Sequence, residues 1–262
     1  FYEEKLEFFD FNKLHKIDVI VHLAAQPSVP ISIENFGSSS SSNILSSIKV
    51  IDYCRVNNIP LVYASSSAIY GNLILGDDKK SNNDLLTPYA VDKFAMEVYS
   101  KTAFKHFHLS SIGLRFFNVY GPRQDSSSSY SGVISKFIHR LLLNQEIFIN
   151  GGYQTRDFIY VEDVIEIIHK SIILVTKNSV CDQMNVLTGK SVSIDEIANI
   201  LIKKTGCCAE KIYQELPIGD PKQSVGSIEK ITNLLDVDLN NMTHIDYGLS
   251  KTLDFMRNQL NS

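Results

Sequence analysis

Four short segments of the chain are apolar at nearly every position rather than at every second one. They span residues 18–25, 60–66, 109–121 and 157–161. A strand that faces water on one side alternates apolar and polar residues, whereas a strand covered on both faces is apolar throughout. These segments therefore predict buried strands of a parallel sheet.

Helical patterns lie between and after these segments. Apolar residues recur with helical spacing in 43–58, 161–175 and 193–206, and the last begins with Ser193 and Glu196 and ends at Gly206, a capping box and a glycine stop. Strands that alternate with helices indicate an α/β fold with right-handed crossovers. After Gly121 the pattern loosens into loops at 125–131 and 216–227, which indicates a smaller second lobe. Two serine runs, 38–42 and 126–129, are interpreted as low-complexity loops.

Composition narrows the class of protein. The chain has 262 residues, 44% apolar content and a net charge of −4, with its basic residues scattered. No basic face for nucleic acid, no apolar run long enough for a bilayer and no signal peptide is found. Its four cysteines lack CxxC spacing, so no metal site or disulfide framework is predicted. A cytoplasmic globular protein is expected.

Tyr89 and Lys93 stand four residues apart after Thr87 and Pro88. Thr-Pro is a favourable helix start, which places Tyr89 in the first turn and Lys93 on the same face. The helix N-terminus and the ammonium both favour a phenolate, so a lowered tyrosine pKa and a general base are predicted. The alternative is a chance spacing on the polar side of an amphipathic helix.

Three consecutive hydroxyls, Ser65, Ser66 and Ser67, end the apolar segment 60–66. Ligands bind beyond the carboxyl ends of parallel strands, so a serine there is suited to hold a substrate hydroxyl beside Tyr89. The alternative is an ordinary serine-rich turn.

Six segments together resemble the extended short-chain dehydrogenase/reductases, in particular the NAD-dependent nucleotide-sugar epimerases similar to UDP-N-acetylglucosamine 4-epimerases. The segments are HLAAQPSV (22–29), YASSSAIYG (63–71), TPYAVDK (87–93), LRFFNVYGPRQ (114–124), TRDFIYVEDV (155–164) and GDPKQSVGSIEK (219–230). The resemblance implies a Rossmann-like, doubly wound parallel sheet with a smaller C-terminal α/β substrate lobe. It divides the chain into an NAD-binding domain at 1–120, to which 156–178 returns, and a nucleotide-sugar lobe at 121–155 and 179–262.

The resemblance also assigns roles to residues. The catalytic residues would be Ser66, Tyr89 and Lys93. The NAD-binding residues would be Asp10, Ala24, Ala25, Gln26, Asn43 and Ser65, together with Tyr89 and Lys93. The substrate-binding residues would be Ser28, Ser66, Ser67, Asn118, Val133, Phe148, Arg156, Lys222 and Ser224. Taken without the resemblance, Asn118 could instead cap a turn and Arg156 could pair with Asp157, while His22 is expected in the core.

The implied reaction is reversible oxidation of the sugar at C4, with Tyr89 as base and NAD as cofactor. Dehydratases and decarboxylases of the family carry acidic residues where this chain has Ser67 and Ala68, so epimerisation is favoured. Ser224 matches a position where a small residue admits 2-acetamido sugars, which suggests UDP-GlcNAc and UDP-GalNAc. Lys222 replaces a frequent arginine. The alternatives are a non-catalytic sugar-nucleotide-binding relative and another NAD-dependent enzyme that modifies nucleotide sugars.

The family's glycine-rich motif for the NAD pyrophosphate does not occur in this sequence. The first strand–helix–strand unit is therefore expected to be absent from these residues, and the chain by itself is expected to bind NAD weakly. The resemblance also implies a homodimer interface formed by the Asn43 and Tyr89 helices. Burial within one subunit is the alternative.

Overall fold

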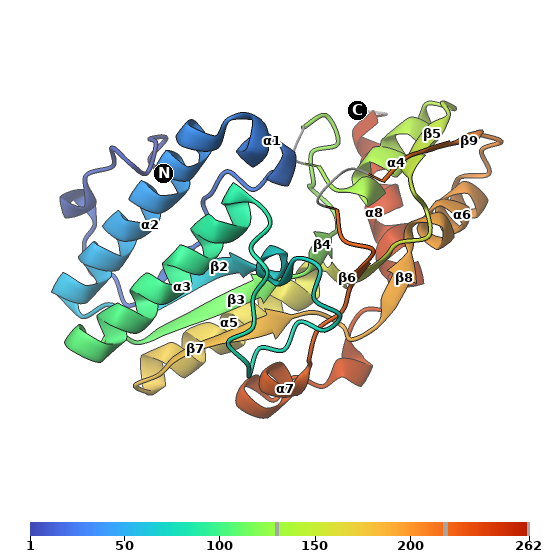
Figure 1. Ribbon diagram of the computed structural model, residues 1–262. Helices are drawn as coiled ribbons and strands as arrows, with labels where there is room; N and C mark the ends of the chain where they lie inside the picture. The colour runs from blue at the N-terminus through green and yellow to red at the C-terminus, as the bar shows by residue number, and fades with distance from the viewer. Residues whose placement is uncertain (129–130, 217–219, 261–262) are drawn as a thin grey trace.

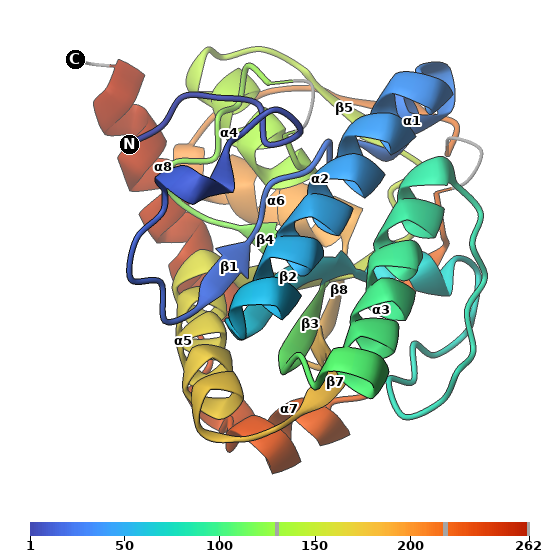
Figure 2. The ribbon, with the colours of Figure 1, turned by 90° about the vertical axis from the view of Figure 1, so that its left-hand side faces the viewer.

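The computed structural model describes residues 1–128, 131–216 and 220–260, and its main sheet lies between two layers of helices (Figure 1). Four of the described strands form this sheet in the order β1 (Ile20–His22), β2 (Leu61–Ser66), β3 (Ser111–Phe116) and β7 (Cys181–Val186), all parallel. Helices α2 (Phe36–Asn57) and α3 (Pro88–Phe107) cover one face, and α5 (Val161–Lys177) and α7 (Glu229–Leu235) cover the other (Figure 2). The expected Rossmann-like α/β fold is confirmed.

The continuous apolar segments are explained by this double cover. In β2, Leu61 and Tyr63 pack against α2 and α3, whereas Val62 between them packs against the α5 side. Successive side chains of a strand point to opposite faces, so a strand with helices on both sides has no polar face.

The segment 109–121 forms two strands rather than one. It contributes β3 to the main sheet and then β4 (Asn118–Tyr120) to a second sheet. There β4 and β10 (Gln223–Ser224) pair in parallel with β6 (Thr155–Tyr160), and β8 (Ser191–Ser193) pairs antiparallel with β6. The chain therefore passes from one sheet to the other at Phe117, which joins the two halves of the molecule.

The second half of the molecule has its own apolar core. This core is formed by α4 (Val133–Leu142), α6 (Ile194–Thr205) and α8 (Ile245–Leu260) with the strands β5 (Ile147–Asn150) and β6, and β5 pairs with β9 (Lys211–Gln214). The shorter elements are α1 (Val29–Glu34) and the 3-10 turns η1 (Phe11–Lys13), η2 (Ser67–Tyr70) and η3 (Leu239–Asn241). The smaller C-terminal α/β lobe is confirmed. Gly206 ends α6 in the left-handed conformation, and Ser193 accepts a hydrogen bond from the Glu196 amide, as predicted.

The prediction of a loop at 38–42 is wrong, because these serines lie inside α2. Ser38 donates to the Asn35 carbonyl and Ser42 donates to the Glu7 carboxylate, so the helix provides partners for hydroxyls that a composition argument assigns to solvent. The end of the second serine run, Ser129, and Gly219 of the last motif lie outside the described residues. Within the described part of the chain, no helix is both long and apolar enough to cross a bilayer.

Candidate active site

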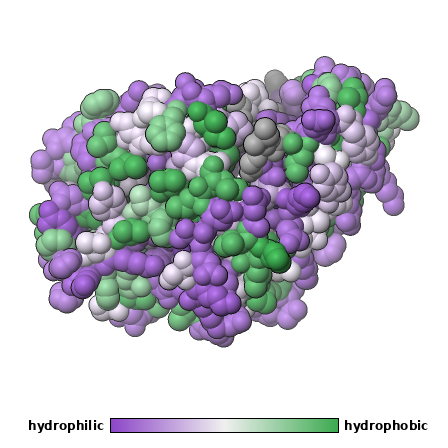
Figure 3. Space-filling model, viewed as in Figure 1, coloured by the Kyte–Doolittle hydropathy of each residue, from purple (hydrophilic) through white to green (hydrophobic). Residues whose placement is uncertain are grey.

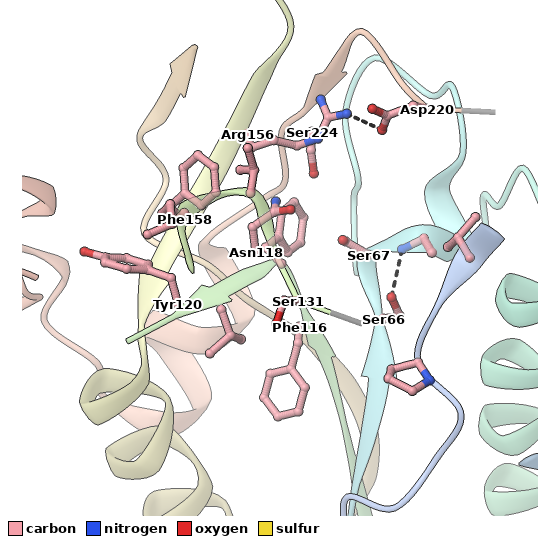
Figure 4. Close-up of a pocket in the computed structure, with 18 of the residues that line it drawn as sticks. Ser66, Ser67, Phe116, Asn118, Tyr120, Ser131, Arg156, Phe158, Asp220 and Ser224 are labelled. Atoms are coloured by element: carbon pink, nitrogen blue, oxygen red, sulfur yellow. Dashed lines mark hydrogen bonds and ion pairs between the residues drawn. The ribbon is translucent and has the colours of Figure 1, made fainter. Parts of the chain in front are cut away.

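A cleft of about 1530 Å³ lies beyond the carboxyl ends of β2 and β3, between the two halves of the molecule. Figure 4 shows Ser66 and Ser67 on one side, with Asn118, Arg156 and Ser224 on the other. The predicted site residues that line it are Ala25, Ser65, Ser66, Ser67, Tyr89, Lys93, Asn118, Val133, Phe148, Arg156 and Ser224. Residues far apart in the sequence thus converge on the sheet edge where parallel-sheet proteins bind ligands.

Helix α3 brings Tyr89 and Lys93 to the cleft. Its N-cap is Thr87, whose hydroxyl accepts a hydrogen bond from the Ala90 amide at 3.2 Å, and Pro88 occupies the first turn, as predicted. The Lys93 ammonium lies 5.7 Å from the centroid of the Tyr89 ring and donates to the Ala64 carbonyl at 2.8 Å. Both side chains are buried, at 9% exposure for Tyr89 and 7% for Lys93.

The prediction of a lowered Tyr89 pKa is wrong for the chain without bound ligand. Burial raises the pKa of this phenol, a hydrogen bond with Ser66 opposes the rise, and the Asp92 carboxylate adds to it. Burial lowers the pKa of Lys93 to about 8, and burial together with the charge of Lys93 lowers that of His22 to about 4. The four-residue spacing predicted that the Lys93 ammonium lies near Tyr89, but the desolvation of these two side chains depends on the tertiary structure.

Two of the strand-end serines, Ser65 and Ser66, have different partners. Ser65 is buried and donates to the Glu97 carboxylate at 2.6 Å. Ser66 caps the η2 turn by accepting from the Ala68 amide at 3.1 Å, a bond that leaves its own hydroxyl proton available. Ser66 is therefore the serine of this strand end that is placed beside Tyr89 and can donate to a ligand.

The opposite wall presents Arg156. Arg156 lies in β6, is 8% exposed and forms an ion pair with Asp220 (Figure 4). The alternative pairing of Arg156 with Asp157 is wrong, because the Asp157 carboxylate accepts hydrogen bonds from the amide and hydroxyl of Thr188 at 2.8 and 2.9 Å. Asn118 donates its side-chain amide to the Asp157 carbonyl at 3.1 Å, which holds β4 against β6. A buried guanidinium of this kind suits a phosphate or carboxylate group.

An aromatic platform lies farther along the same wall. The Arg140 guanidinium is 4.7 Å from the centroid of the Phe148 ring and forms an ion pair with Glu146 at 3.1 Å. The resemblance indicated Phe148 but not Arg140, Gln154 or Asp220, which also line the cleft. Only Asp220 had a signal in the sequence, as a member of the quoted segment 219–230.

Gln26 and Asn43 do not line the cleft but order the loop that does. The Gln26 backbone amide donates to the Asn43 side-chain oxygen at 2.7 Å, and the Asn43 side-chain nitrogen donates to the Gln26 backbone carbonyl at 3.2 Å. Asn43 also donates to the buried Asp92 carboxylate at 3.0 Å. The loop around Ala25 is thereby tied to both α2 and α3.

The remaining predicted residues lie outside the cleft lining. Asp10 caps η1 by accepting from the Asn12 amide, and Ser28 caps α1 by accepting from the Ile31 amide. Ala24 and Lys222 are exposed. The Lys222 side chain is therefore solvent-exposed and is not part of the cleft lining that includes Arg156.

The residues at the α3 end fit the nicotinamide and ribose of NAD. The Lys93 ammonium has three protons and donates one of them to the Ala64 backbone carbonyl. Ala25 and Ala64 line the cleft with small side chains. Lys93 and Tyr89 would hold ribose hydroxyls, and the cofactor would supply hydride acceptance and return.

Comparison with known proteins agrees with this geometry. Residues 3–186 match the model of the NAD dependent epimerase/dehydratase family. A putative UDP-glucose 4-epimerase of Methanocaldococcus jannaschii is 33% identical over 98% of this chain and 80% of its own length. A UDP-glucuronate 4-epimerase of Thermodesulfobacterium geofontis is 30% identical over 94% of this chain and 74% of its own length.

Solved structures extend the similarity to the fold. A UDP-N-acetylglucosamine 4-epimerase of Methanobrevibacter ruminantium, in complex with UDP-N-acetylmuramic acid, superposes with a TM-score of 0.88 at 32% identity, covering 98% of this chain and 83% of that one. A UDP-glucose 4-epimerase of Thermus thermophilus in complex with NAD gives a TM-score of 0.82 at 28% identity, covering 92% and 78%. Together with the Ser66, Tyr89 and Lys93 cluster, these matches show that the chain belongs to the NAD-dependent epimerase/dehydratase family of enzymes.

Proposed function

We propose that this protein interconverts UDP-GlcNAc and UDP-GalNAc by NAD-dependent epimerisation at C4. The observation that carries the proposal is the meeting of Tyr89, Lys93 and Ser66 at one end of a cleft whose other wall presents Arg156. The first group suits proton transfer at a sugar hydroxyl, and the second suits a diphosphate.

The residues of this chain would act in sequence on the sugar 4-hydroxyl. Ser66 would donate a hydrogen bond to the sugar, and the Tyr89 oxygen would take the 4-hydroxyl proton while the hydride passes from C4 to the bound NAD. Because burial raises the pKa of Tyr89, the phenolate needs the positive charge of Lys93 close by. Arg156 would hold the diphosphate while the 4-keto sugar rotates and presents its opposite face to the cofactor. After the hydride returns to C4 on that face, Tyr89 would return the proton to the C4 oxygen.

Two features support an acetamido sugar and epimerisation. Ser224 is a small, half-buried residue in the cleft wall, which leaves room for a 2-acetamido group. Ser67 and Ala68 follow Ser66 where an acid would be needed to protonate a leaving hydroxyl. The Methanobrevibacter ruminantium relative is described as a UDP-N-acetylglucosamine 4-epimerase, which agrees with this choice.

The experiment is to incubate the protein with NAD and UDP-GlcNAc and to follow UDP-GalNAc by proton NMR. Conversion that is lost in Tyr89→Phe supports the proposal. Ser224→Tyr should lower the conversion of UDP-GlcNAc while it spares UDP-glucose, because only the 2-acetamido group needs the space. Binding of UDP-GlcNAc without any conversion would instead support a non-catalytic sugar-nucleotide-binding protein, and release of a dehydrated sugar would support a dehydratase.

We also propose that the protein forms a homodimer through α2 and α3. These helices lie side by side on one face of the main sheet (Figure 1), and apolar residues are exposed among polar ones on that side of the molecule (Figure 3). The exposed apolar side chains on the two helices are Phe36, Leu45, Val56, Val91, Val98, Tyr99 and Phe107. Burying such residues against a second copy would remove them from water.

Sedimentation at micromolar concentration tests the dimer. We expect twice the mass of the chain for the wild type and the mass of one chain for Val98→Asp. The control is Ile173→Asp, an exposed apolar residue on α5 at the other face of the sheet, which should leave the dimer intact. A monomeric wild type would contradict the proposal.

A further inference from the structure

A buried chain of polar side chains runs from the catalytic helix through the sheet, beneath the cleft. It begins with Glu97 of α3, which is 0% exposed and forms a two-pronged ion pair with Arg115 of β3 at 2.8 and 2.7 Å. Ser65 donates to the same carboxylate at 2.6 Å. These bonds join the helix of Tyr89 to β2, the strand that ends at Ser66, and to the neighbouring strand β3.

Tyr70 extends this polar chain to the other edge of the sheet. Its hydroxyl accepts a bond from the Arg115 guanidinium at 2.7 Å and donates to the Asn185 side chain at 2.7 Å. Burial raises the pKa of Tyr70 to about 12, so this hydroxyl keeps its proton for Asn185 at neutral pH. Its position between a fixed donor and a fixed acceptor leaves it one orientation.

Asn185 then holds two surface segments together. Its side-chain amide has two protons, and one is donated to the Gly76 carbonyl at 2.8 Å and the other to the Ser227 carbonyl at 3.0 Å. The same two segments pair through backbone bonds, from the Gly76 amide to the Val225 carbonyl at 2.8 Å and from the Ser227 amide to the Gly76 carbonyl at 2.9 Å. Asn185 is completely buried, and its amide gives the Gly76 carbonyl a second donor beside the Ser227 amide and supplies a donor to the Ser227 carbonyl.

The contact between Asn185 and the second segment leaves no spare space. A Cβ added to Gly226 would lie 2.6 Å from Phe117 and 3.0 Å from the Asn185 amide nitrogen. Ser224 and Val225, which precede Gly226, line the cleft, and Ser224 pairs with Arg156 between β10 and β6. This cleft wall is therefore held from below by the Asn185 amide together with the backbone bonds between the two segments.

We propose that Asn185 is a positioning residue for the substrate, which acts through the segment 224–227 and connects it to the catalytic helix by way of Tyr70 and Arg115. This inference rests on the proposed function for the identity of the substrate. Asn185 is not among the residues that line the cleft, so its effect on substrate must pass through Ser224 and Val225. Its loss would loosen the wall that faces the sugar and leave Ser66, Tyr89 and Lys93 in place.

The test compares Asn185→Leu with Gln183→Met. Leucine keeps the volume of Asn185 but removes both donors and the acceptor. Gln183 lies two residues earlier in β7, on the same face, and is equally buried, and its side-chain nitrogen has no hydrogen-bond partner among the described residues. The control therefore changes a buried side chain of the same strand whose amide nitrogen makes no hydrogen bond to either surface segment in the described part of the chain.

Two measurements are made on both variants. We expect hydrogen–deuterium exchange of peptides covering 74–78 and 223–228 to rise about tenfold or more in Asn185→Leu, because the Gly76 and Ser227 carbonyls each lose one of the hydrogen bonds that join the two segments. We expect KM for UDP-GlcNAc to rise about tenfold with kcat within about twofold of the wild type. Gln183→Met should change neither quantity.

The outcomes separate this inference from the proposed function. Unchanged exchange at 223–228, or a fall in kcat at constant KM, would overturn the positioning role. If the wild type converts no UDP-sugar, the proposed function fails, and exchange in the cofactor-free protein still decides whether Asn185 holds the segment. Should Asn185→Leu not fold, Tyr70→Phe removes one hydroxyl, and faster exchange at 223–228 is again the result required.

Discussion

Replacing Lys93 by methionine should stabilise the protein while removing its activity. Lys93 is 7% exposed, and burial lowers its pKa from 10.5 to about 8. The unfolded chain therefore binds more protons than the folded one between pH 8 and 10.5, so the free energy of unfolding rises with pH across that window. Below pH 8 the full penalty of burying the ammonium is present, about 3 kcal/mol for a shift of this size. Methionine removes that penalty together with one hydrogen bond to the Ala64 carbonyl, worth about 1 kcal/mol.

The informative quantity is the difference in the free energy of unfolding between Lys93→Met and the wild type at two pH values. At pH 7 the wild type carries a penalty of about 3 kcal/mol, and at pH 9.5 about 1.4 kcal/mol remains, so the advantage of the variant should shrink by about 2 kcal/mol. Packing and the lost hydrogen bond contribute equally at both pH values and cancel. Urea unfolding of the cofactor-free proteins measures this difference, with Lys101→Met, an exposed lysine on α3, as control. A difference that stays constant from pH 7 to 9.5 would refute the reasoning.

Three further changes test the site and its support. Tyr89→Phe should lower epimerisation at least about 100-fold with the dissociation constant for UDP unchanged by calorimetry, because only proton transfer is lost. Arg156→Lys should weaken UDP binding roughly tenfold, since a point charge replaces a fork that can hold two phosphate oxygens, and unchanged affinity would remove Arg156 from the diphosphate site. Gly226→Ala should destabilise the protein by about 1–3 kcal/mol in urea, because its Cβ would lie 2.6 Å from Phe117, whereas Gly37→Ala in open space should not destabilise it.

Local signals in the sequence were sufficient where one residue determines its own conformation or that of its neighbours. Thr87 and Pro88 start α3 as predicted, and Ser193 and Gly206 bound α6. The serine run 38–42 failed as a local signal because helix packing and bonds to the preceding turn outweigh the low helix propensity of serine.

The placement of the candidate site shows the same division. The apolar runs and the motifs were sufficient to predict that Ser66, Tyr89 and Lys93 lie at one edge of the sheet. The carboxyl ends of parallel strands and the helices that follow them meet at that edge. Spacing did not predict the partner of Arg156, which is Asp220 in a distant segment rather than its neighbour Asp157.

The sequence by itself determined the α/β fold, the start of α3 and the family, since these depend on periodicity and on short motifs. Only the tertiary structure decided the protonation of the site. Burial raises the pKa of Tyr89 and lowers that of Lys93, and the depth of a side chain is a property of everything packed around it. The tertiary structure likewise decided that Asn185 supports the cleft wall, because its partners at Tyr70, Gly76 and Ser227 are remote in the sequence and become neighbours only when the sheet forms.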